Sequence, residues 1–199
     1  MESCMSAFDA LILAGGRGQR LAGKDKGWIM WDGLPLIEHV LARLHLQDKK
    51  PERILISANR NLDAYKQTGY LVVSDERPDF PGPLAGIEAG LLRCKRNRLL
   101  VVPCDTPLIP TDLHERLDQA MNDQPNAKAA YATTSDGPEP LCCLLDPLIG
   151  ASLSHFLSRG HGSVISWLED IKAVAVEFSD PDAFRNFNTP EIFDSKRST

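Results

Sequence analysis

The segment LILAGGRGQRLAGKDKG, Leu11 to Gly27, is the most informative part of this chain. It begins within a short apolar run, Ala10 to Leu13, which is typical of a buried strand. The run stops at Gly15-Gly16, where a backbone without Cβ atoms can bend sharply and approach a ligand closely. Backbone N–H groups and fixed cations after the first strand of an α/β unit suit a di- or triphosphate. A Gly-rich surface loop with solvated charges is the alternative interpretation.

Basic residues follow the two glycines and are candidates for phosphate contacts: Arg17, Arg20, Lys24 and Lys26. Two familiar phosphate motifs nearly fit this segment, and both fail. Gly18 to Asp25 has the glycine and lysine spacing of a Walker A loop, but Asp25 stands where Ser or Thr would bind Mg²⁺. In the dinucleotide fingerprint, Leu21 takes the place of the third glycine.

Composition narrows the classes of protein that the chain could be. With 199 residues, 43% hydrophobic and 25% charged, it can bury its own core. A net charge of −5 argues against a general nucleic-acid binder, so the basic loop favours a small anionic ligand. The sequence lacks an apolar run of the roughly 18 residues that span a bilayer, and Glu2 stands where a secretory signal carries positive charge. We expect a cytoplasmic protein that binds neither nucleic acid nor membrane, with its five cysteines reduced.

Apolar strand-like runs alternate with helical patterns along one domain, residues 8–194, between an N-terminal extension, 1–7, and a disordered tail, 195–199. Strands are predicted at 10–13, 53–58, 70–73, 99–102, 127–134, 141–146 and 171–178. Helices are predicted at 35–46, 62–68, 84–94, at 147–159, in a short segment ending at 170, and from Thr111 or Asp112 to Asn122. The alternation predicts a single-domain, Rossmann-like α/β fold, a mostly parallel central sheet with helices on both faces.

Ligands of such sheets bind beyond the carboxyl ends of the strands. Four separate segments come directly after a predicted strand: Gly15-Gly16, residues 57–59, Ser74-Asp75 and Cys104-Asp105. We therefore expect them to meet at one edge of the sheet, within reach of Lys26.

Asp105 is the candidate metal ligand, because Mg²⁺ is held by one or two carboxylates together with phosphate oxygens. An ordinary turn-capping Asp is its alternative. Lys26 is the candidate that neutralises charge on the phosphates, with Arg20 assisting, and a solvated loop lysine is its alternative. Asp75 could lie beside the nucleotide or in a plain turn. Asn186 and Asn188 are interpreted first as a capped helix start, and second as amides that meet a substrate.

Five segments in this order resemble the molybdenum cofactor guanylyltransferases: LAGGRGQRLAGKDKG, SANRN, VSDERPDFPGPLAG, PCDTPLIP and FNTPEIF. The resemblance runs from about Phe8 to Phe193. It implies a Rossmann-like fold and the reaction of GTP with molybdenum-bound molybdopterin, which gives the guanine dinucleotide cofactor and pyrophosphate. LAGG alone would indicate only the wider nucleotidyltransferase superfamily.

By matching position, the resemblance implies that Leu13, Ala14 and Gly15 hold the nucleotide and that Lys26 meets its phosphates. It implies that Asp75 contacts GTP and that Asp105 binds Mg²⁺. Gly16 and Arg20 would together let the loop approach the phosphates closely and neutralise their charge. The implied partners are GTP, molybdenum-bound molybdopterin and the proteins that deliver or accept the cofactor, and we expect a monomer.

The chain departs from relatives at two positions. Ser57 stands where some relatives carry Asn, so a nucleotide contact there could pass to Asn59. Glu139 stands where a His is frequent, on the acceptor side. Two rival functions follow: a related transferase that uses CTP or a sugar phosphate, and a catalytically silent nucleotide-binding regulator. Lys26 and Asp105 together argue against the regulator.

Overall fold

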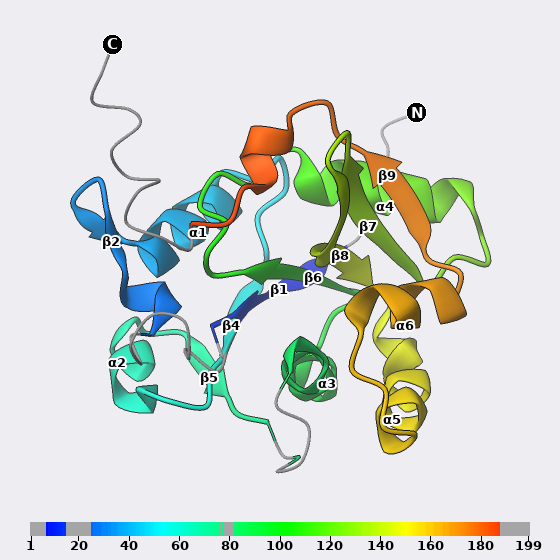
Figure 1. Ribbon diagram of the computed structural model, residues 1–199, viewed down its shortest axis with the longest axis horizontal. Coiled ribbons are helices and arrows are strands. Elements are labelled where there is room, and N and C mark those ends of the chain that lie inside the picture. The colour runs from blue at the N-terminus through cyan, green and yellow to red at the C-terminus, as the bar shows by residue number, and fades with distance from the viewer. Residues whose placement is uncertain (1–6, 15–24, 76, 78–81, 188–199) are drawn as a thin grey trace.

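The computed structural model describes residues 7–14, 25–75, 77 and 82–187. Its centre is a seven-stranded sheet in the order β5-β4-β1-β6-β8-β7-β9 (Figure 1). The strands are β1 (Phe8–Leu13), β4 (Arg53–Ser57), β5 (Leu71–Val73), β6 (Arg98–Pro103), β7 (Ala129–Thr134), β8 (Gly137–Leu145) and β9 (Val174–Glu177). Only β8 runs against the other described strands of this sheet, because it pairs antiparallel with both β6 and β7. The prediction of a mostly parallel sheet is confirmed.

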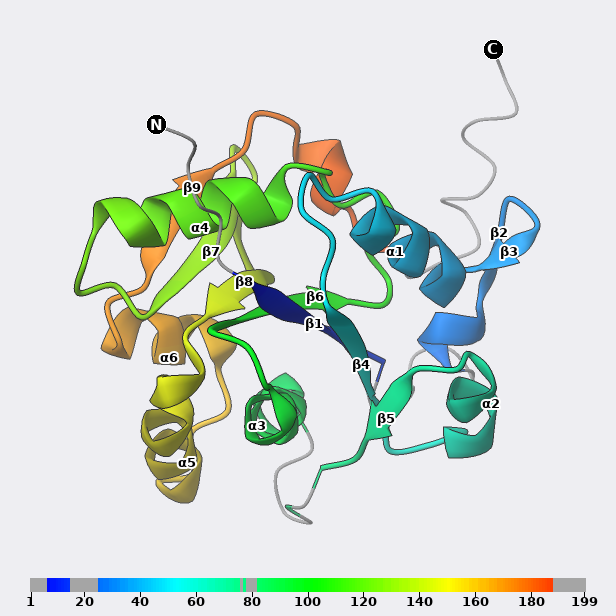
Figure 2. The same ribbon diagram turned by 180° about the vertical axis from the view of Figure 1, so that it is seen from behind.

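Helices lie on both faces of the sheet (Figures 1 and 2). On one face are α1 (Leu36–His45) and α4 (Leu113–Asp123), and on the other are α3 (Pro83–Arg93), α5 (Gly150–Ser158) and α6 (Val164–Asp170). A short helix, α2 (Leu62–Gln67), lies beside β5. Each face has its own apolar core, and the two cores share no described residue.

β1 shows why the first apolar run becomes a central strand. All six of its residues are buried. Phe8 and Ile12 pack in the core on the α1 and α4 side, while Leu11 and Leu13 pack in the core on the α3 side. Successive side chains of a strand point to opposite faces, so a strand covered on both faces is mostly apolar. The charged residue of β1, Asp9, is buried in an ion pair with Arg53.

Helix α3 lies close to β1 because of a glycine. A Cβ atom on Gly90 would lie 2.4 Å from the Cδ2 atom of Leu11, which is fully buried. Real Cβ contacts do not become that short, so only glycine permits this spacing between helix and strand.

The structure changes several predicted boundaries. A small hairpin, β2 (Met30–Trp31) with β3 (Leu34–Pro35), was not predicted, since each strand has only two residues. The predicted helix 147–159 begins as a 3-10 turn, η2 (Pro147–Ile149), and the predicted strand 171–178 shrinks to β9. Two further 3-10 turns are η1 (Lys26–Trp28) and η3 (Pro181–Phe184). Asp112 occupies the N-cap of α4, but its side chain makes no capping hydrogen bond; the Gln47 Oε1 atom accepts from the His114 N–H instead, at 3.0 Å.

The carboxyl ends of the strands meet at one edge of the sheet, as predicted. β4, β1 and β6 lie side by side in parallel register, with Ser57, Leu13 and Pro103 at their last paired positions. β8 begins at the same edge, because Gly137 pairs with Thr134 at the end of β7. This edge carries the candidate site.

Candidate active site

The site is centred on an ion pair between Lys26 and Asp105. The Nζ atom of Lys26 lies 2.8 Å from the Oδ2 atom of Asp105, although the two residues are 79 positions apart in the chain. The Asp105 side chain is 10% exposed and the Lys26 side chain 39% exposed. The Asp105 carboxylate is therefore mostly withdrawn from water, whereas the Lys26 side chain remains accessible to a ligand.

Leu13 and Ala14 form a backbone platform at the end of β1. The Ala14 N–H donates to the Ser57 carbonyl at 2.8 Å, and the Leu13 carbonyl accepts from the Cys104 N–H at 3.1 Å. Both residues are buried, so their backbone is fixed between the ends of β4 and β6. Gly15, Gly16 and Arg20, the other residues predicted to bind nucleotide in this loop, lie outside the described residues.

Asp75 follows β5 and is locked by Asn59, which follows β4. The Asn59 Nδ2 atom donates to Asp75 Oδ2 at 2.7 Å, and the Asp75 N–H donates to Asn59 Oδ1 at 3.0 Å. Burial raises the pKa of the Asp75 carboxyl, as does the charge of Glu88, while the Asn59 hydrogen bond lowers it. Within the described part of the chain, the buried Oδ1 atom has no hydrogen-bond partner. Asn59 therefore orients a carboxylate that keeps one acceptor oxygen.

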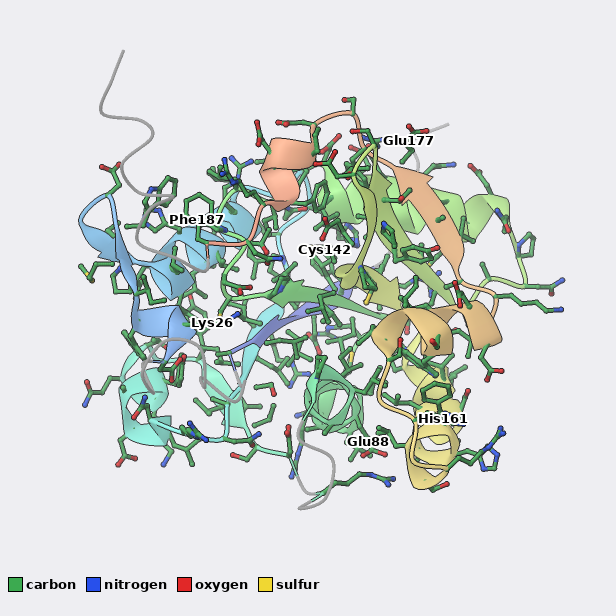
Figure 3. All side chains as sticks on the ribbon, in the orientation of Figure 1. Lys26, Glu88, Cys142, His161, Glu177 and Phe187 are labelled. Atoms are coloured by element: carbon green, nitrogen blue, oxygen red, sulfur yellow. The ribbon has the colours of Figure 1, made fainter. Side chains whose placement is uncertain are left out.

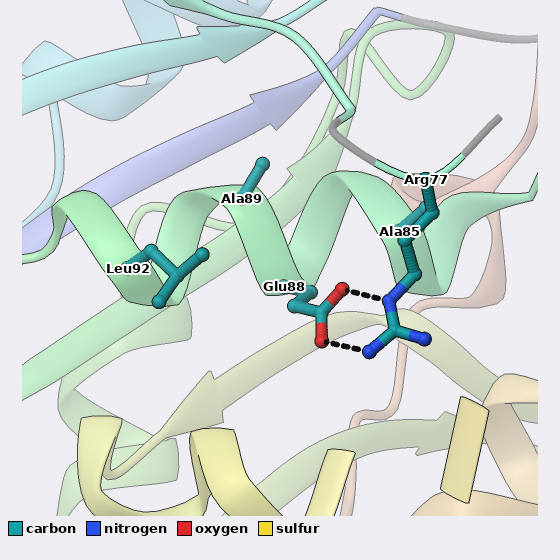
Figure 4. A pocket seen from close by; sticks show the side chains of 5 residues that line it. All are labelled: Arg77, Ala85, Glu88, Ala89 and Leu92. Atoms are coloured by element: carbon teal, nitrogen blue, oxygen red, sulfur yellow. Dashed lines mark hydrogen bonds and ion pairs between the residues drawn. The ribbon is translucent and has the colours of Figure 1, made fainter. Parts of the chain in front are cut away.

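Arg77, two positions after Asp75, is bonded to two helices. Arg77 donates to both carboxylate oxygens of Glu88 on α3, at 2.6 and 3.0 Å, and to the Ser154 Oγ atom on α5 at 2.7 Å. Figure 4 shows the Arg77–Glu88 pair beside a groove lined by Ala85, Ala89 and Leu92. Glu88 lies well apart from Lys26 in Figure 3, so this groove is not part of the ion-pair site.

The loop that carries Asp105 is held by the segment that follows η3. The Phe187 N–H donates to the Asp105 carbonyl at 2.8 Å, and the Thr106 hydroxyl donates to Asn186 Oδ1 at 3.1 Å. The Phe187 ring packs on Trp31 of the β2–β3 hairpin, with 4.7 Å between ring centroids. In Figure 3 Phe187 and Lys26 lie on the same side of the molecule. Asn186 therefore supports the Asp105 loop, while Asn188 and the residues of the predicted helix start that follow it lie outside the described residues.

The two departures from relatives have different surroundings. The Ser57 side chain is buried, and a Cβ on Gly86 of α3 would lie 2.5 Å from its Oγ atom. The Ser57 hydroxyl therefore faces α3. Glu139 lies at the start of β8, and its pKa is raised by burial and by the charge of Asp136.

A metal ion at this edge would rely on few protein ligands. The described residues contain no group of three or more His, Cys, Asp or Glu side chains that could hold a metal ion. A single carboxylate, that of Asp105, nevertheless fits Mg²⁺, which completes its coordination with phosphate oxygens and water.

None of the described helices has the length and apolar character that crossing a membrane requires.

Comparisons with known proteins show the family of this chain. Residues 10–173 match the MobA-like NTP transferase domain. A molybdenum cofactor guanylyltransferase from Polynucleobacter asymbioticus is 45% identical to the chain over 184 residues, which cover 91% of both proteins. The enzyme of the same name from Ralstonia pickettii is 43% identical and covers 94% of both. The chain belongs to the molybdenum cofactor guanylyltransferase family.

Solved structures place this guanylyltransferase family member in a wider fold group. Molybdopterin-guanine dinucleotide biosynthesis protein A from Archaeoglobus fulgidus has a TM-score of 0.70 and 22% identity, covering 92% of this chain and 93% of its own. A CMP:2-keto-3-deoxy-manno-octonic acid synthetase complexed with CTP has the same TM-score at 15% identity and covers 94% of both chains. At these identities the likeness concerns the fold alone, so it does not decide which base is bound.

In this family member, the structure brings together four of the residues predicted from sequence to bind nucleotide or metal: Leu13, Ala14, Lys26 and Asp105. Asp75 lies at the same edge of the sheet, two strands from β1. Sequence reasoning missed the supports around them, above all Asn59 as the partner of Asp75 and Phe187 as the partner of the Asp105 backbone. An Asn directly after a strand was the available signal for Asn59, whereas nothing in the sequence announces Phe187.

Proposed function

We propose that this protein transfers GMP from GTP to molybdenum-bound molybdopterin, forming the guanine dinucleotide cofactor and releasing pyrophosphate. The observation that carries the proposal is the Lys26–Asp105 pair at the carboxyl edge of the sheet, in a chain of the guanylyltransferase family. A triphosphate with its divalent cation offers the matching charges, since phosphate oxygens pair with an ammonium and a cation pairs with a carboxylate.

The reaction needs little acid–base chemistry from the protein. The terminal phosphate of molybdopterin is already anionic, so one of its oxygens can form the new bond to the α-phosphorus of GTP directly. The bond from the α-phosphorus to the bridging oxygen breaks, and its electron pair leaves with pyrophosphate. The protein's contribution is therefore positioning and charge stabilisation.

Each residue of the site has a stated part in this proposal. Lys26 binds the β- and γ-phosphates and stabilises the charge that grows on pyrophosphate. Asp105 holds Mg²⁺, which when bound would polarise the phosphate oxygens. Asp75 offers its Oδ1 atom, which has no hydrogen-bond partner among the described residues, to an N–H or O–H donor of the nucleotide. The backbone of Leu13 and Ala14 supports the nucleotide beside them.

The proposal is tested with purified protein, Mg²⁺ and molybdenum-bound molybdopterin, supplied in turn with GTP, ATP, CTP and UTP. Mass spectrometry of the pterin product and a pyrophosphate assay measure the reaction. We expect the guanine dinucleotide to form far faster than the others. Preferential use of CTP would favour the related transferase, and nucleotide binding without any product would favour the silent regulator.

Selective binding of GTP should also appear without the acceptor. A ligand that binds only the native state raises the apparent stability by mass action. GTP with Mg²⁺ should therefore raise the melting temperature more than ATP, CTP or UTP does at equal concentration. Differential scanning fluorimetry measures this, and equal shifts with CTP and GTP would contradict the guanine preference.

A further inference from the structure

Asp25, directly before Lys26, accepts hydrogen bonds from residues that lie far away in the chain. Its Oδ1 atom accepts from the Tyr65 hydroxyl at 2.6 Å and from the Gly27 N–H at 3.2 Å. Its Oδ2 atom accepts from the Asn61 Nδ2 atom at 3.1 Å. Capping η1 requires only the Gly27 contact. The two donors from the α2 region therefore exceed what the local turn needs.

Asn61 makes this contact in place of a helix-capping hydrogen bond and from a strained backbone conformation. It occupies the N-cap position of α2, where an Asn side chain normally accepts a hydrogen bond from the helix. Here it makes no such bond, and its backbone is left-handed, with φ of 50°. A non-glycine residue in that conformation is uncommon and mildly strained. Its amide reaches across to Asp25 instead.

Tyr65 fits against the turn at one glycine. The Tyr65 side chain is fully buried, and a Cβ atom on Gly27 would lie 2.4 Å from its hydroxyl oxygen. Burial raises the pKa of the Tyr65 phenol well above its usual range, so the hydroxyl keeps its proton for Asp25 at any working pH. The ring also packs on Trp28, with 5.3 Å between ring centroids.

These contacts fix the backbone on both sides of Lys26. Asp25 is held through its carboxylate, and Gly27 is held through its N–H and through close packing. The Lys26 side chain is long, flexible and 39% exposed, and a partly exposed ion pair restrains such a chain weakly. The fixed backbone on both sides of Lys26 therefore helps to set the direction of its side chain toward Asp105.

We propose that Tyr65 and Asn61 are positioning residues, which act through Asp25 to aim the Lys26 ammonium at Asp105 and at the nucleotide phosphates. The role in catalysis rests on the proposed function. Neither side chain touches the reacting groups. A small misplacement of a catalytic group can cost up to about a hundredfold in rate, so the loss of one such hydrogen bond should be visible in kcat.

The test compares Tyr65→Phe with a matched control, Tyr70→Phe. Each variant removes one hydroxyl, and the Tyr70 hydroxyl lies 2.9 Å from His45 Nε2 at the exposed end of α1. Tyr65→Phe should lower kcat by about tenfold and Tyr70→Phe should not. Asn61→Gly, which suits the left-handed backbone and removes the amide, should lower kcat in the same direction.

A double variant distinguishes positioning of Lys26 from a merely structural role of Tyr65. If Tyr65 acts through Lys26, then Tyr65→Phe should have no further effect on kcat once Lys26 is alanine. An equal tenfold loss in both backgrounds, or an unchanged kcat in Tyr65→Phe, would overturn the proposal.

A second readout does not depend on the reaction at all. The rate at which acetic anhydride modifies the Lys26 amine, measured by mass spectrometry, reports how firmly Asp105 holds it. We expect faster modification in Tyr65→Phe than in the wild type or Tyr70→Phe. If the wild type makes no dinucleotide, the proposed function fails while this assay still decides the positioning. Equal modification rates in all three proteins would overturn it.

Discussion

At the scale of single residues, the site depends on charges that meet across the fold. Lys26 follows the loop after β1, and Asp105 follows β6, yet their charged atoms lie 2.8 Å apart. Sequence reasoning could name both, because each follows an apolar run at a point where ligands of parallel sheets bind. It also placed both at one edge of the sheet, but it did not predict the direct ion pair between them, since no local pattern records a pairing over 79 positions.

Asp105→Asn tests the carboxylate as a metal ligand. The substitution keeps the shape of the side chain and removes the charge that would hold Mg²⁺. We expect circular dichroism to show an intact fold, and guanylyl transfer to fall by at least about a hundredfold. Near-normal transfer at ordinary Mg²⁺ concentrations would end the assignment of Asp105 as the metal ligand.

His114 predicts a pH dependence of stability. It is fully buried and stacked on Phe8, and among the described residues neither ring nitrogen has a hydrogen-bond partner. Its pKa is lowered to about 4, mainly by burial; the charge of Asp118 raises it, and the charges of Lys49 and Arg98 lower it. Because the folded-state pKa lies below the unfolded one, His114 stabilises the fold fully above pH 6.5, and this contribution is lost as the pH falls toward 4.

Urea unfolding at several pH values measures the effect. Between pH 7 and pH 4.5 the wild type should lose about 2 kcal/mol more of its free energy of unfolding than His114→Phe, which keeps the stacked ring. The same loss in both proteins would show that His114 does not carry this pH dependence.

At the scale of elements, burial on both faces explains which strands the sequence could predict. β1 and β6 are mostly apolar because cores lie on both sides of them, and both were expected close to their observed bounds. The β2–β3 hairpin was missed because two-residue strands leave no periodic pattern. The start of β8 was also missed, since Gly137-Pro138 favours a turn, although these residues pair with the end of β7.

Gly90→Ala tests the close packing of α3 on β1. The new Cβ would lie 2.4 Å from a buried Leu11 methyl group, so the free energy of unfolding should fall by about 1–2 kcal/mol, after a small gain in helix propensity. Gly150→Ala on α5 is the matched control, because nothing lies within 4 Å of its added Cβ. Its stability should stay unchanged or rise slightly. Equal changes in both variants would contradict close packing as the cause.

At the scale of the whole molecule, the sheet gathers residues from separate loops at one edge. The fold class and the carboxyl-edge site follow from strand–helix alternation and the parallel-sheet rule. The residues that hold the site in place do not follow from these rules. Asn59, Tyr65 and Phe187 contact it through side-chain and backbone positions that only the packed structure defines.

The central claim is that Lys26 and Asp105 act as one unit in the transfer reaction. A double-mutant cycle on kcat, with Lys26→Ala, Asp105→Asn and both together, measures this coupling most directly. We expect Lys26→Ala alone to cost roughly 2–4 kcal/mol of transition-state stabilisation, and the double variant to be little slower than the slower single variant. A Lys26→Ala enzyme with a raised KM for GTP and a normal kcat, or fully additive losses in the double variant, would contradict the claim.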